Sequence, residues 1–276
     1  MPNTTVQQST QRRIFITGGA SGLGKAIAFK YAKQGYKVCI GDVNEQRGQE
    51  TVTELTALGA QAYYLHCDIT QETDLEAAKN SLLAQWGGVD IVVNNAGVAG
   101  TAGAIDEVSM EDWQWVININ LLGVARGCKV FSALFKAQNS GYFINIASAA
   151  GLMNAPQMSS YNASKAGVIS ISETLKLELE KFNVGVSVVC PAFFKTNLTE
   201  SMKATHPSVV KQISKVMARS KVSADNVAND IYHCQQQNKF WVLSHKPEKK
   251  LWLLKRYLPS VFTKVMKKQM AKLFAS

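Results

Sequence analysis

The sequence predicts a single α/β domain with a doubly wound parallel sheet, followed by a basic helical C-terminal extension. Residues 13–17 form a short apolar strand that runs into a glycine-rich turn and then into a helical pattern. From there to residue 190, apolar segments of strand length alternate with amphipathic segments of helix length. The chain has 276 residues, of which 46% are hydrophobic and 18% charged, enough for a substantial buried core.

The glycine-rich turn reads GGASGLG at residues 18–24. A strand, such a turn and a helix in that order open a Rossmann-type dinucleotide-binding unit. Gly18 and Gly22 would allow a tight turn and close approach of the backbone to a ligand, and Gly24 would let the helix pack on the strand. The exposed amides at the helix start would then face a pyrophosphate. The candidate cofactor contacts in this turn are Gly18, Ser21, Gly22, Leu23 and Gly24.

Asp42 stands at the end of the second expected strand, 36–41, eighteen residues after Gly24. An acid at this position accepts the hydroxyls of an adenosine ribose and repels a 2′-phosphate. No basic residue follows it directly, and the one nearby cation is Arg47. The sequence therefore favours NAD over NADP as cofactor. Alternatively, Asp42 caps the helix that begins near Asn44, and the two roles can coexist.

Further strands are expected at 61–66, 89–93, 142–147 and 184–190, with helices at 45–58, 71–86, about 109–138 and 158–182 between them. The almost wholly apolar strand 89–93 fits a sheet covered on both faces. It ends in Asn94-Asn95-Ala96-Gly97, at the carboxyl edge where ligands bind in such sheets. We therefore expect Asn94, Ala96 and Gly97 to lie beside a cofactor rather than in a simple turn.

Two asparagines, Asn118 and Asn120, lie in the apolar face of the expected helix 109–138. A buried side-chain amide needs hydrogen-bond partners. We therefore expect both side chains to have partners within the fold.

Ser148 follows the apolar strand 142–147, and Tyr161 lies in the next long helix, four residues before Lys165. On a helix this spacing places the phenol and the ammonium on one face. A phenol ionises near pH ~10, and lowering its pKa by three units requires about 4 kcal/mol, much of which a fixed cation in a dry site can supply. Such a phenol can take a proton from an alcohol or give one to a carbonyl. Alternatively, the pair is a half-buried ring beside a solvated amine, so the surrounding motifs decide.

The motifs that carry chemistry are residues 17–24, Asp68, 94–97, Asn120 within 119–123, Ser148, 161–165 and 191–196. In this order and at these separations, the chain resembles the short-chain dehydrogenase/reductase family over about residues 12–243. Each motif alone is a modest signal, whereas the ordered set is specific. The sequence departs from the family pattern at Ala192, where the family usually has glycine.

The resemblance implies roles for four catalytic residues. Tyr161 would be the general acid/base, and Ser148 would bind the reacting oxygen. Lys165 would lower the pKa of Tyr161 and hold the nicotinamide ribose. Asn120 would keep a water in line with Lys165 as part of a proton relay.

The resemblance also implies cofactor contacts beyond the glycine-rich turn. Asp68, with Ile69 beside it, would bind the adenine, and Asn94 would line the cofactor channel. The segment from Val189 to Thr196, which includes Pro191, would place the nicotinamide, with Thr196 near the carboxamide. A homodimer or homotetramer formed through the helices 109–138 and 158–182 is implied as well.

Motifs and resemblance together predict an NAD(H)-dependent dehydrogenase or reductase of an alcohol or ketone, in a domain spanning residues 12–244. The substrate lid is expected at 193–222, and its apolar residues favour a lipophilic substrate: Phe193, Phe194, Met202, Val209, Val210, Ile213 and Met217. Alternatively, these residues pack on the core. Two other hypotheses are a cofactor-sensing binding protein with an idle catalytic set, and a peripheral membrane protein whose enzyme activity is secondary.

The extension, residues 245–276, carries nine lysines or arginines and one acid, a net charge of +8 out of +10 for the chain. Its apolar residues fall at helical spacing between the lysines: Val261, Phe262, Val265, Met266, Met270, Leu273 and Phe274. With Trp252 and Tyr257 upstream, the pattern fits a helical segment, 249–275, that lies on an anionic membrane surface. Alternatively, the apolar stripe docks on a neighbouring subunit. The extension has no nucleic-acid recognition motif, so nucleic acid is not an expected partner.

The five cysteines are scattered, without a close pair or a metal-ligand spacing to histidine. We therefore expect reduced thiols, no metal site and a cytoplasmic protein. Residues 1–13 have no apolar run of the kind found in signal sequences. The sequence also has no run of roughly 20 apolar residues, so no helix is expected to span a membrane.

Overall fold

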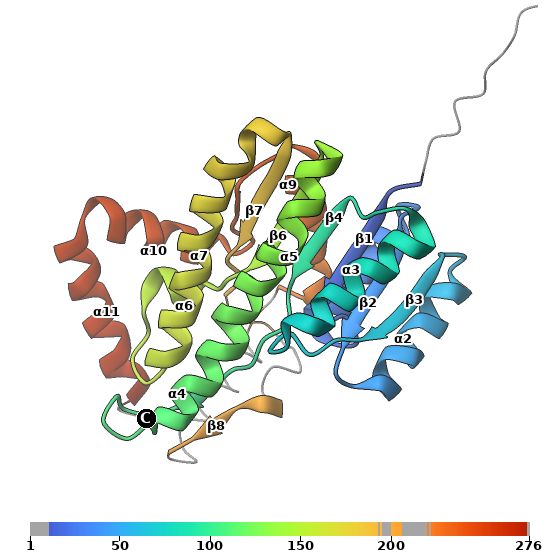
Figure 1. The fold of residues 1–276 in the computed structure, drawn as a ribbon. Helices are drawn as coiled ribbons and strands as arrows, with labels where there is room; N and C mark the ends of the chain where they lie inside the picture. The colour runs from blue at the N-terminus through green and yellow to red at the C-terminus, as the bar shows by residue number, and fades with distance from the viewer. Residues whose placement is uncertain (1–10, 193, 195–199, 206–219, 221, 275–276) are drawn as a thin grey trace, which may run out of the picture.

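In the computed structural model, which describes residues 11–192, 194, 200–205, 220 and 222–274, seven parallel strands form the central sheet (Figure 1). Their order is β3-β2-β1-β4-β6-β7-β9. The strands are β1 (Arg13–Thr17), β2 (Lys37–Asp42), β3 (Ala62–His66), β4 (Ile91–Asn94), β6 (Gly141–Ile146), β7 (Val184–Val189) and β9 (Trp241–Val242). This arrangement confirms the predicted doubly wound parallel sheet.

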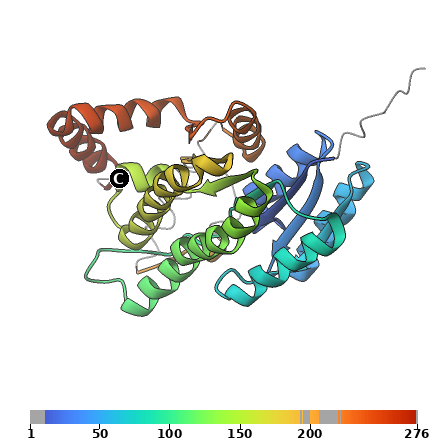
Figure 2. The same cartoon turned by 45° about the horizontal axis from the view of Figure 1, so that its top comes forward.

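Helices cover both faces of the sheet, as Figures 1 and 2 show. One face carries α3 (Glu72–Trp86), α5 (Gly123–Gln138) and α7 (Ser159–Leu179), and the other carries α1 (Gly22–Ala32), α2 (Glu45–Ala57) and α9 (Ala224–Gln236). The smaller elements are α4 (Met110–Ile117), α6 (Ala149–Met153), a 3-10 turn (Glu180–Phe182) and the strand pair β5 (Thr101–Ala102) and β8 (Lys203–Ala204). The expected helix 158–182 therefore ends in a 3-10 turn.

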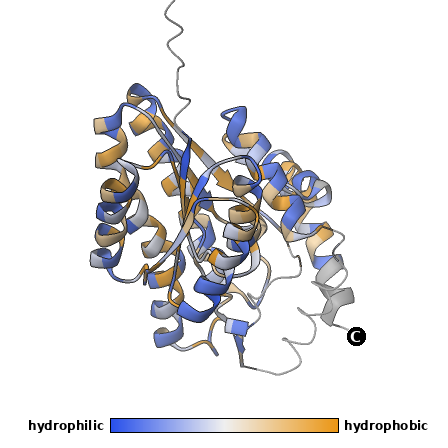
Figure 3. Cartoon of the chain, turned by 90° about the vertical axis from the view of Figure 1, so that its right-hand side faces the viewer, coloured by the Kyte–Doolittle hydropathy of each residue, from blue (hydrophilic) through white to orange (hydrophobic). Residues whose placement is uncertain are grey.

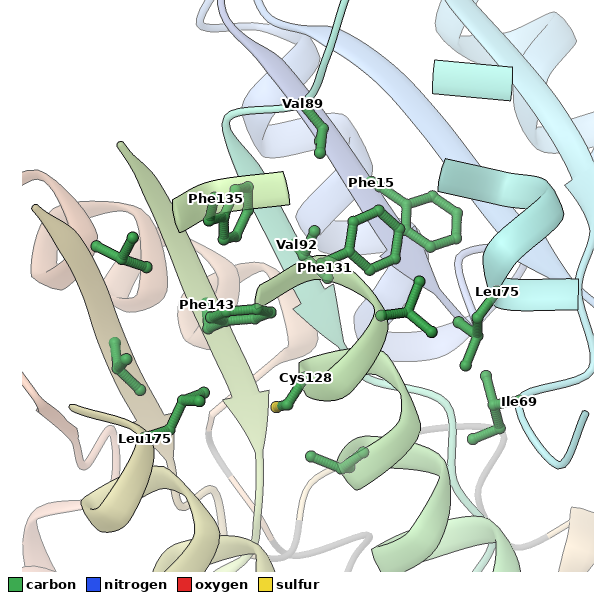
Figure 4. Packing of buried hydrophobic residues seen from close by; sticks show 14 of the residues in the cluster. Phe15, Ile69, Leu75, Val89, Val92, Cys128, Phe131, Phe135, Phe143 and Leu175 are labelled. Carbon is green, nitrogen blue, oxygen red and sulfur yellow. The ribbon is translucent and has the colours of Figure 1, made fainter. Parts of the chain in front are cut away.

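Each face of the sheet has its own hydrophobic core, because alternate residues of a strand point to opposite faces. In β1, Phe15 packs with the α3, α5 and α7 side, whereas its neighbours Ile14 and Ile16 pack with the α1, α2 and α9 side. Figure 4 shows the first core around Phe15 and Phe131, whose ring centroids lie 5.5 Å apart. Burying such a side chain contributes about 1.5–3 kcal/mol. The two cores pack the sheet between its two layers of helices.

The flanking helices alternate between hydrophilic and hydrophobic residues along their length (Figure 3). By contrast, every residue of the central strand β4 is buried, as expected for a strand covered on both faces. Within the described part of the chain, none of the helices is both long and apolar enough to cross a membrane.

The strand order reverses between β1 and β4, which are neighbours in the sheet although β2 and β3 separate them in the sequence. In register, Phe15 of β1 pairs with Cys39 of β2 on one side and Val92 of β4 on the other. The loops after β1 and β4 therefore leave the sheet in different directions, which opens a crevice at its carboxyl edge. The candidate site lies at this edge.

The expected helix 109–138 is divided by a π-helical turn, Asn118–Leu122, between α4 and α5. The turn contains Asn118 and Asn120, the two polar residues of the otherwise apolar helix face. The Arg126 guanidinium donates to the side-chain oxygen of Asn118 over 2.8 Å, and the Asn120 side chain bonds the main chain of Val98. Both asparagines have partners, as expected, and the predicted long helix is present, with a π-helical turn within it that was not predicted.

The C-terminal extension forms two helices, α10 (Lys246–Tyr257) and α11 (Pro259–Phe274), which pack against each other. Proline at the first position of α11 fits a helix start, where its missing N–H is not needed. The hairpin lies beside α6 in Figures 1 and 2. Phe262 is buried, so part of the predicted apolar stripe packs on the chain itself, a partner that the sequence pattern did not reveal.

Candidate active site

A cavity of about 580 Å³ opens at the carboxyl edge of the sheet. The predicted site residues that line it are Gly18, Ser21, Gly22, Leu23, Asp42, Asp68, Ile69, Ala96, Gly97, Ser148, Tyr161, Lys165 and Pro191. Gly24, Asn94 and Asn120 do not line it. Thr196 lies outside the described residues. The fold thus brings segments from the ends of six strands, β1, β2, β3, β4, β6 and β7, to one cavity.

The glycine-rich turn owes its shape to close backbone contacts. Gly18 and Gly22 have φ values of +64° and +52°, which favour glycine. A Cβ on Gly24 would lie 2.1 Å from the carbonyl oxygen of Gly18, so only glycine fits there. Ser21 is the N-cap residue of α1, and its side chain makes no capping hydrogen bond. The Ser21 side chain therefore does not occupy the first amides of α1, at a helix start that favours anions.

Asn95, rather than Asn94, connects the end of β4 to this turn. The Asn95 side-chain nitrogen donates to the carbonyl oxygens of Thr17 and Gly18, over 2.9 and 3.1 Å, and Asn95 lines the cavity. Asn94 is buried and donates to the side-chain oxygen of Asn145 over 2.8 Å. Asn94 is the last residue of β4 and its side chain points toward Cys128 of α5, whereas Asn95 lies in the loop after the strand. The sequence analysis missed Asn95, although it belongs to the same motif.

Asp42 is held by main-chain donors at the end of β2. Its carboxylate oxygens accept hydrogen bonds from the amides of Ala20 and Asn44, each over 3.0 Å. Asn44, not Asp42, caps α2, because its side-chain oxygen accepts from the Arg47 amide over 2.9 Å. Arg47 also pairs with Glu200 over 2.9 Å. The alternative role of Asp42 as the helix cap is therefore wrong.

Asp68 lies on the same side of the cavity, after β3. Its side-chain oxygen accepts from the Thr70 amide over 2.9 Å, and its own amide donates to Asp74 over 3.0 Å. These bonds orient the loop that also presents Ile69 to the cavity.

Ser148 and Tyr161 meet at the other end of the cavity. Ser148 caps α6: its oxygen accepts from the Ala150 amide over 3.1 Å, and its hydroxyl donates to the carbonyl of Pro191 over 3.4 Å. Tyr161 lies in the first turn of α7 and is buried. Burial raises the pKa of the Tyr161 phenol, whereas its hydrogen bond with Ser148 lowers it by less. The phenol is therefore protonated at neutral pH.

Lys165 lies one turn further along α7 and is also buried. Its Nζ donates to the carbonyl oxygen of Ile146 over 2.9 Å and lies 5.8 Å from the centre of the Tyr161 ring. Burial lowers the pKa of Lys165 to about 8. The sequence analysis expected Lys165 to lower the pKa of Tyr161. In this structure that pKa is instead raised, because desolvation of the phenol outweighs the stabilising contacts.

Asn120 is fully buried behind the cavity wall. Its side chain makes paired hydrogen bonds of 2.8 and 2.9 Å with the amide and carbonyl of Val98. A Cβ on Gly97 would lie 2.9 Å from the Asn120 oxygen and 3.5 Å from Lys165 Nζ. Gly97 thus separates Asn120 from Lys165 with the smallest possible residue.

The sequence matches known proteins over most of its length. The family model described as short chain dehydrogenase matches residues 12–207. The chain belongs to the short-chain dehydrogenase family, a family of oxidoreductases. The 3-oxoacyl-(acyl-carrier-protein) reductase of Synechocystis sp. is 34% identical over 196 residues, 71% of this chain and 79% of that protein.

Two further relatives resemble this short-chain dehydrogenase. The cyclopentanol dehydrogenase of Comamonas sp. is 31% identical over 189 residues, 68% of this chain and 75% of that protein. A crystal structure of a short-chain dehydrogenase/reductase from Burkholderia phymatum in complex with NAD has a TM-score of 0.86 and 32% identity. The match covers 91% of this chain and 95% of that chain.

The remaining wall of the short-chain dehydrogenase site is mostly apolar, although Glu200 and Ser201 also line the cavity. Beyond Tyr161, the cavity is lined by Met153, Ala155, Met158, Phe194, Met202, Leu251 and Met266. Phe194 and Met202 belong to the expected substrate lid. The other apolar lid residues, Phe193, Val209, Val210, Ile213 and Met217, lie outside the described residues. Leu251 and Met266 come from the C-terminal hairpin, and the sequence analysis did not place them in the site.

The C-terminal extension also contacts the segment after β7. The amide of Ala192, where the family usually has glycine, donates to Nδ1 of His245 over 3.2 Å. His245 is buried and precedes the first residue of α10. Within the part of the chain that the structure describes, no group of three or more His, Cys, Asp or Glu residues is suited to a metal ion.

Proposed function

We propose that this short-chain dehydrogenase transfers a hydride between NAD(H) and a lipophilic alcohol or ketone. One observation carries the proposal: Ser148, Tyr161 and Lys165 line the same cavity as the glycine-rich turn. A hydroxyl pair suited to a reacting oxygen and a cradle suited to a dinucleotide therefore share one space.

The nucleotide end of the cavity fits a dinucleotide. The turn around Gly18 excludes side chains, since an added Cβ would lie 2.8 Å from the Ala96 Cα, and the start of α1 offers its amides to a pyrophosphate. Asp42, fixed by two main-chain donors, would accept the ribose hydroxyls and repel a 2′-phosphate. Arg47, the cation that would favour NADP, is engaged by Glu200. These contacts support NAD, as does the NAD in the Burkholderia relative.

The protein's own residues would manage the proton. When bound, the nicotinamide supplies hydride chemistry. Tyr161 would give its phenolic proton to a carbonyl oxygen, or take the proton of an alcohol in the reverse direction. Ser148 would donate a hydrogen bond to the same oxygen. Lys165, held by the Ile146 carbonyl, would place a cation beside the phenol and stabilise the phenolate as it forms.

The substrate end favours an apolar molecule. Its wall consists mainly of methionine, alanine, leucine and phenylalanine side chains, and pockets of this kind bind ligands chiefly by apolar contact. A chain of carbon atoms carrying one hydroxyl or carbonyl group matches this lining better than a sugar does.

A panel of secondary alcohols and ketones of increasing length tests the proposal. Oxidation and reduction are followed by nicotinamide absorbance, with NAD(H) and NADP(H) in turn. We expect turnover with NAD(H) and a preference for the lipophilic members. NADH binding without turnover of any member would instead support the cofactor-sensing alternative.

A homodimer or homotetramer through α5 and α7 belongs to the same proposal. Leu177 of α7 is 74% exposed, and Leu122, just before α5, is 43% exposed. Covering large apolar side chains on these adjacent helices would stabilise an assembly. Sedimentation velocity measures the mass of the protein in solution. A single species at the mass of one chain would exclude the proposed homodimer or homotetramer.

A second candidate function is contact with an anionic membrane through the C-terminal hairpin. Tyr257 and Leu258, at the turn between α10 and α11, are 72% and 55% exposed. Exposed lysines follow on α11: Lys264, Lys267 and Lys268. Apolar and basic side chains on one surface favour anionic lipid. A twofold contact between two copies of this face would bring like charges together, which is unfavourable.

Liposome sedimentation tests this contact with the full chain. We expect binding to vesicles of phosphatidylserine and phosphatidylcholine that decreases with salt, and at least tenfold weaker binding when Lys264, Lys267 and Lys268 are all changed to Glu. Lys33, Lys181 and Lys239, exposed on other surfaces, provide a triple Lys→Glu control with the same change of charge. Equal sedimentation of both variants and the wild type would exclude the hairpin as the contact.

A further inference from the structure

The C-terminal hairpin closes one side of the cavity that contains the catalytic serine and tyrosine. Leu251 of α10 and Met266 of α11 line the same cavity as Ser148 and Tyr161. Both residues lie beyond residues 12–207, the part of the chain that the family model matches. This wall is therefore supplied by a part of the chain outside the family match.

The beginning of the hairpin is fastened to the domain at two points. The Ala192 amide donates to Nδ1 of His245 over 3.2 Å, just before α10. Within α10, the ring of Trp252 packs on Trp241 of β9, with ring centroids 5.0 Å apart. These contacts tie α10 to the sheet edge on either side of Leu251. Its position relative to the cavity is thereby set by the sheet.

A third contact joins the hairpin to the helix that begins at the catalytic serine. Lys255 Nζ donates to the carbonyl oxygen of Leu152 in α6 over 2.6 Å, and it also lies 5.9 Å from the ring centre of Phe262. Phe262 is buried and one turn before Met266 on α11. Partial burial lowers the pKa of Lys255. The contact holds both helices of the hairpin against α6.

The two helices present different side chains to the cavity and to the outside. Leu253, two residues from Leu251, is 38% exposed and does not line the cavity. Val261, five residues from Met266, is 45% exposed and does not line it either. Residues at these spacings lie on different sides of a helix. The apolar residues of the hairpin are thus divided between a cavity side and an outer side.

We infer that Leu251 and Met266 determine the length of the apolar substrate that the site accepts. In the cavity that they share with Ser148 and Tyr161, their side chains fill space that a longer carbon chain would need. This inference rests on the proposed function and adds the residues that set its specificity. In a tight apolar pocket, each extra carbon atom that has to fit changes kcat/KM by about tenfold or more.

The test compares Leu251→Ala and Met266→Ala with two controls, Leu253→Ala and Val261→Ala. The substrates are methyl ketones from 2-butanone to 2-dodecanone, with NADH. We expect kcat/KM for the longest ketones, relative to 2-butanone, to rise about tenfold in each cavity variant and to stay unchanged in the controls. Met266→Phe, which adds volume, should lower the same ratio. Thermal melting shows that each variant is folded.

Binding of the same ketones to the NADH-loaded protein, measured by calorimetry, separates this inference from the proposed function. If no ketone is turned over, the proposed function fails, but a selective gain in affinity for long ketones in the two cavity variants still supports the inference. If the chain-length profile of the cavity variants equals that of the controls, the inference is overturned. Absence of ketone binding to every variant overturns it as well.

Discussion

Lys165 Nζ donates a hydrogen bond of 2.9 Å to the carbonyl oxygen of Ile146, the last residue of β6. The bond ties α7 to the strand that leads into Ser148, so the cation and the serine are positioned by the same strand end. It also holds an ammonium group in a place from which water is nearly excluded, since Lys165 is 4% exposed. Burial accordingly lowers its pKa to about 8.

This buried lysine predicts a specific pH dependence of stability. Its pKa is about 8 in the folded state, against an ordinary value of 10.5, so between these values the unfolded chain binds more protons. The free energy of unfolding therefore rises with pH across this window. Below pH 8 the buried lysine is charged, and the full destabilisation that results from burying this charge is present. Between pH 7 and 10, the free energy of unfolding of the wild type should rise by roughly 2 kcal/mol relative to Lys165→Met.

Urea denaturation at several pH values measures this difference. The exposed Lys33→Met provides a control for the loss of a lysine elsewhere. Parallel stability curves for the wild type and Lys165→Met would show that the folded-state pKa of Lys165 is not lowered.

Tyr161→Phe removes the proposed proton donor and leaves the ring in place. We expect the variant to bind NADH within a few-fold of the wild type, because the phenol adds little to cofactor affinity, and to lose nearly all turnover. Stopped-flow absorbance and NADH fluorescence measure the two quantities. Tyr142→Phe is the matched control: its hydroxyl is buried and bonded to Ser187 over 2.8 Å, away from the cavity. Undiminished turnover in Tyr161→Phe would show that Tyr161 is not the general acid/base.

Asp42→Asn removes the charge that we propose repels a 2′-phosphate. We expect the ratio of kcat/KM with NADP to kcat/KM with NAD to rise about tenfold, corresponding to about 1.4 kcal/mol. Asp68→Asn is the comparison, because an acid near the adenine should affect both cofactors alike. An unchanged ratio in Asp42→Asn would assign cofactor choice to other residues.

Gly24→Ala should disrupt the nucleotide cradle. The added Cβ would lie 2.1 Å from the Gly18 carbonyl oxygen and 2.6 Å from the Asn95 side-chain nitrogen. Relieving this clash requires a shift of the turn, so we expect at least tenfold weaker NADH binding and a loss of about 1–3 kcal/mol in stability.

Fluorescence titration and thermal melting measure these two effects. In Gly35→Ala, the new Cβ meets nothing within 4 Å but the φ of +80° is strained. This control should lose stability and keep its NADH affinity. Equal affinity in both variants would show that the turn does not form the cradle.

Much of this molecule follows from local sequence pattern. Strand and helix periodicity, the glycine-rich turn and the spacing of Tyr161 and Lys165 are properties of short segments, and the parallel sheet that they predict is confirmed. The same patterns located the strand ends, where the cavity lies. The π-helical turn at Asn118–Leu122 was not predicted, because it depends on contacts with Val98 and Arg126 rather than on periodicity.

Tertiary packing decided what local pattern left open. Asn94, at the end of β4, is buried against Cys128 and Asn145, whereas Asn95 lies in the loop that follows and lines the cavity. Tyr161 has a raised pKa because the folded chain removes water from around it, an effect that sequence spacing does not report. The amphipathic extension had the pattern of a surface-binding helix, yet Phe262 and Met266 turn toward its own domain. An apolar stripe specifies that it will be buried, and only the complete fold specifies against which surface.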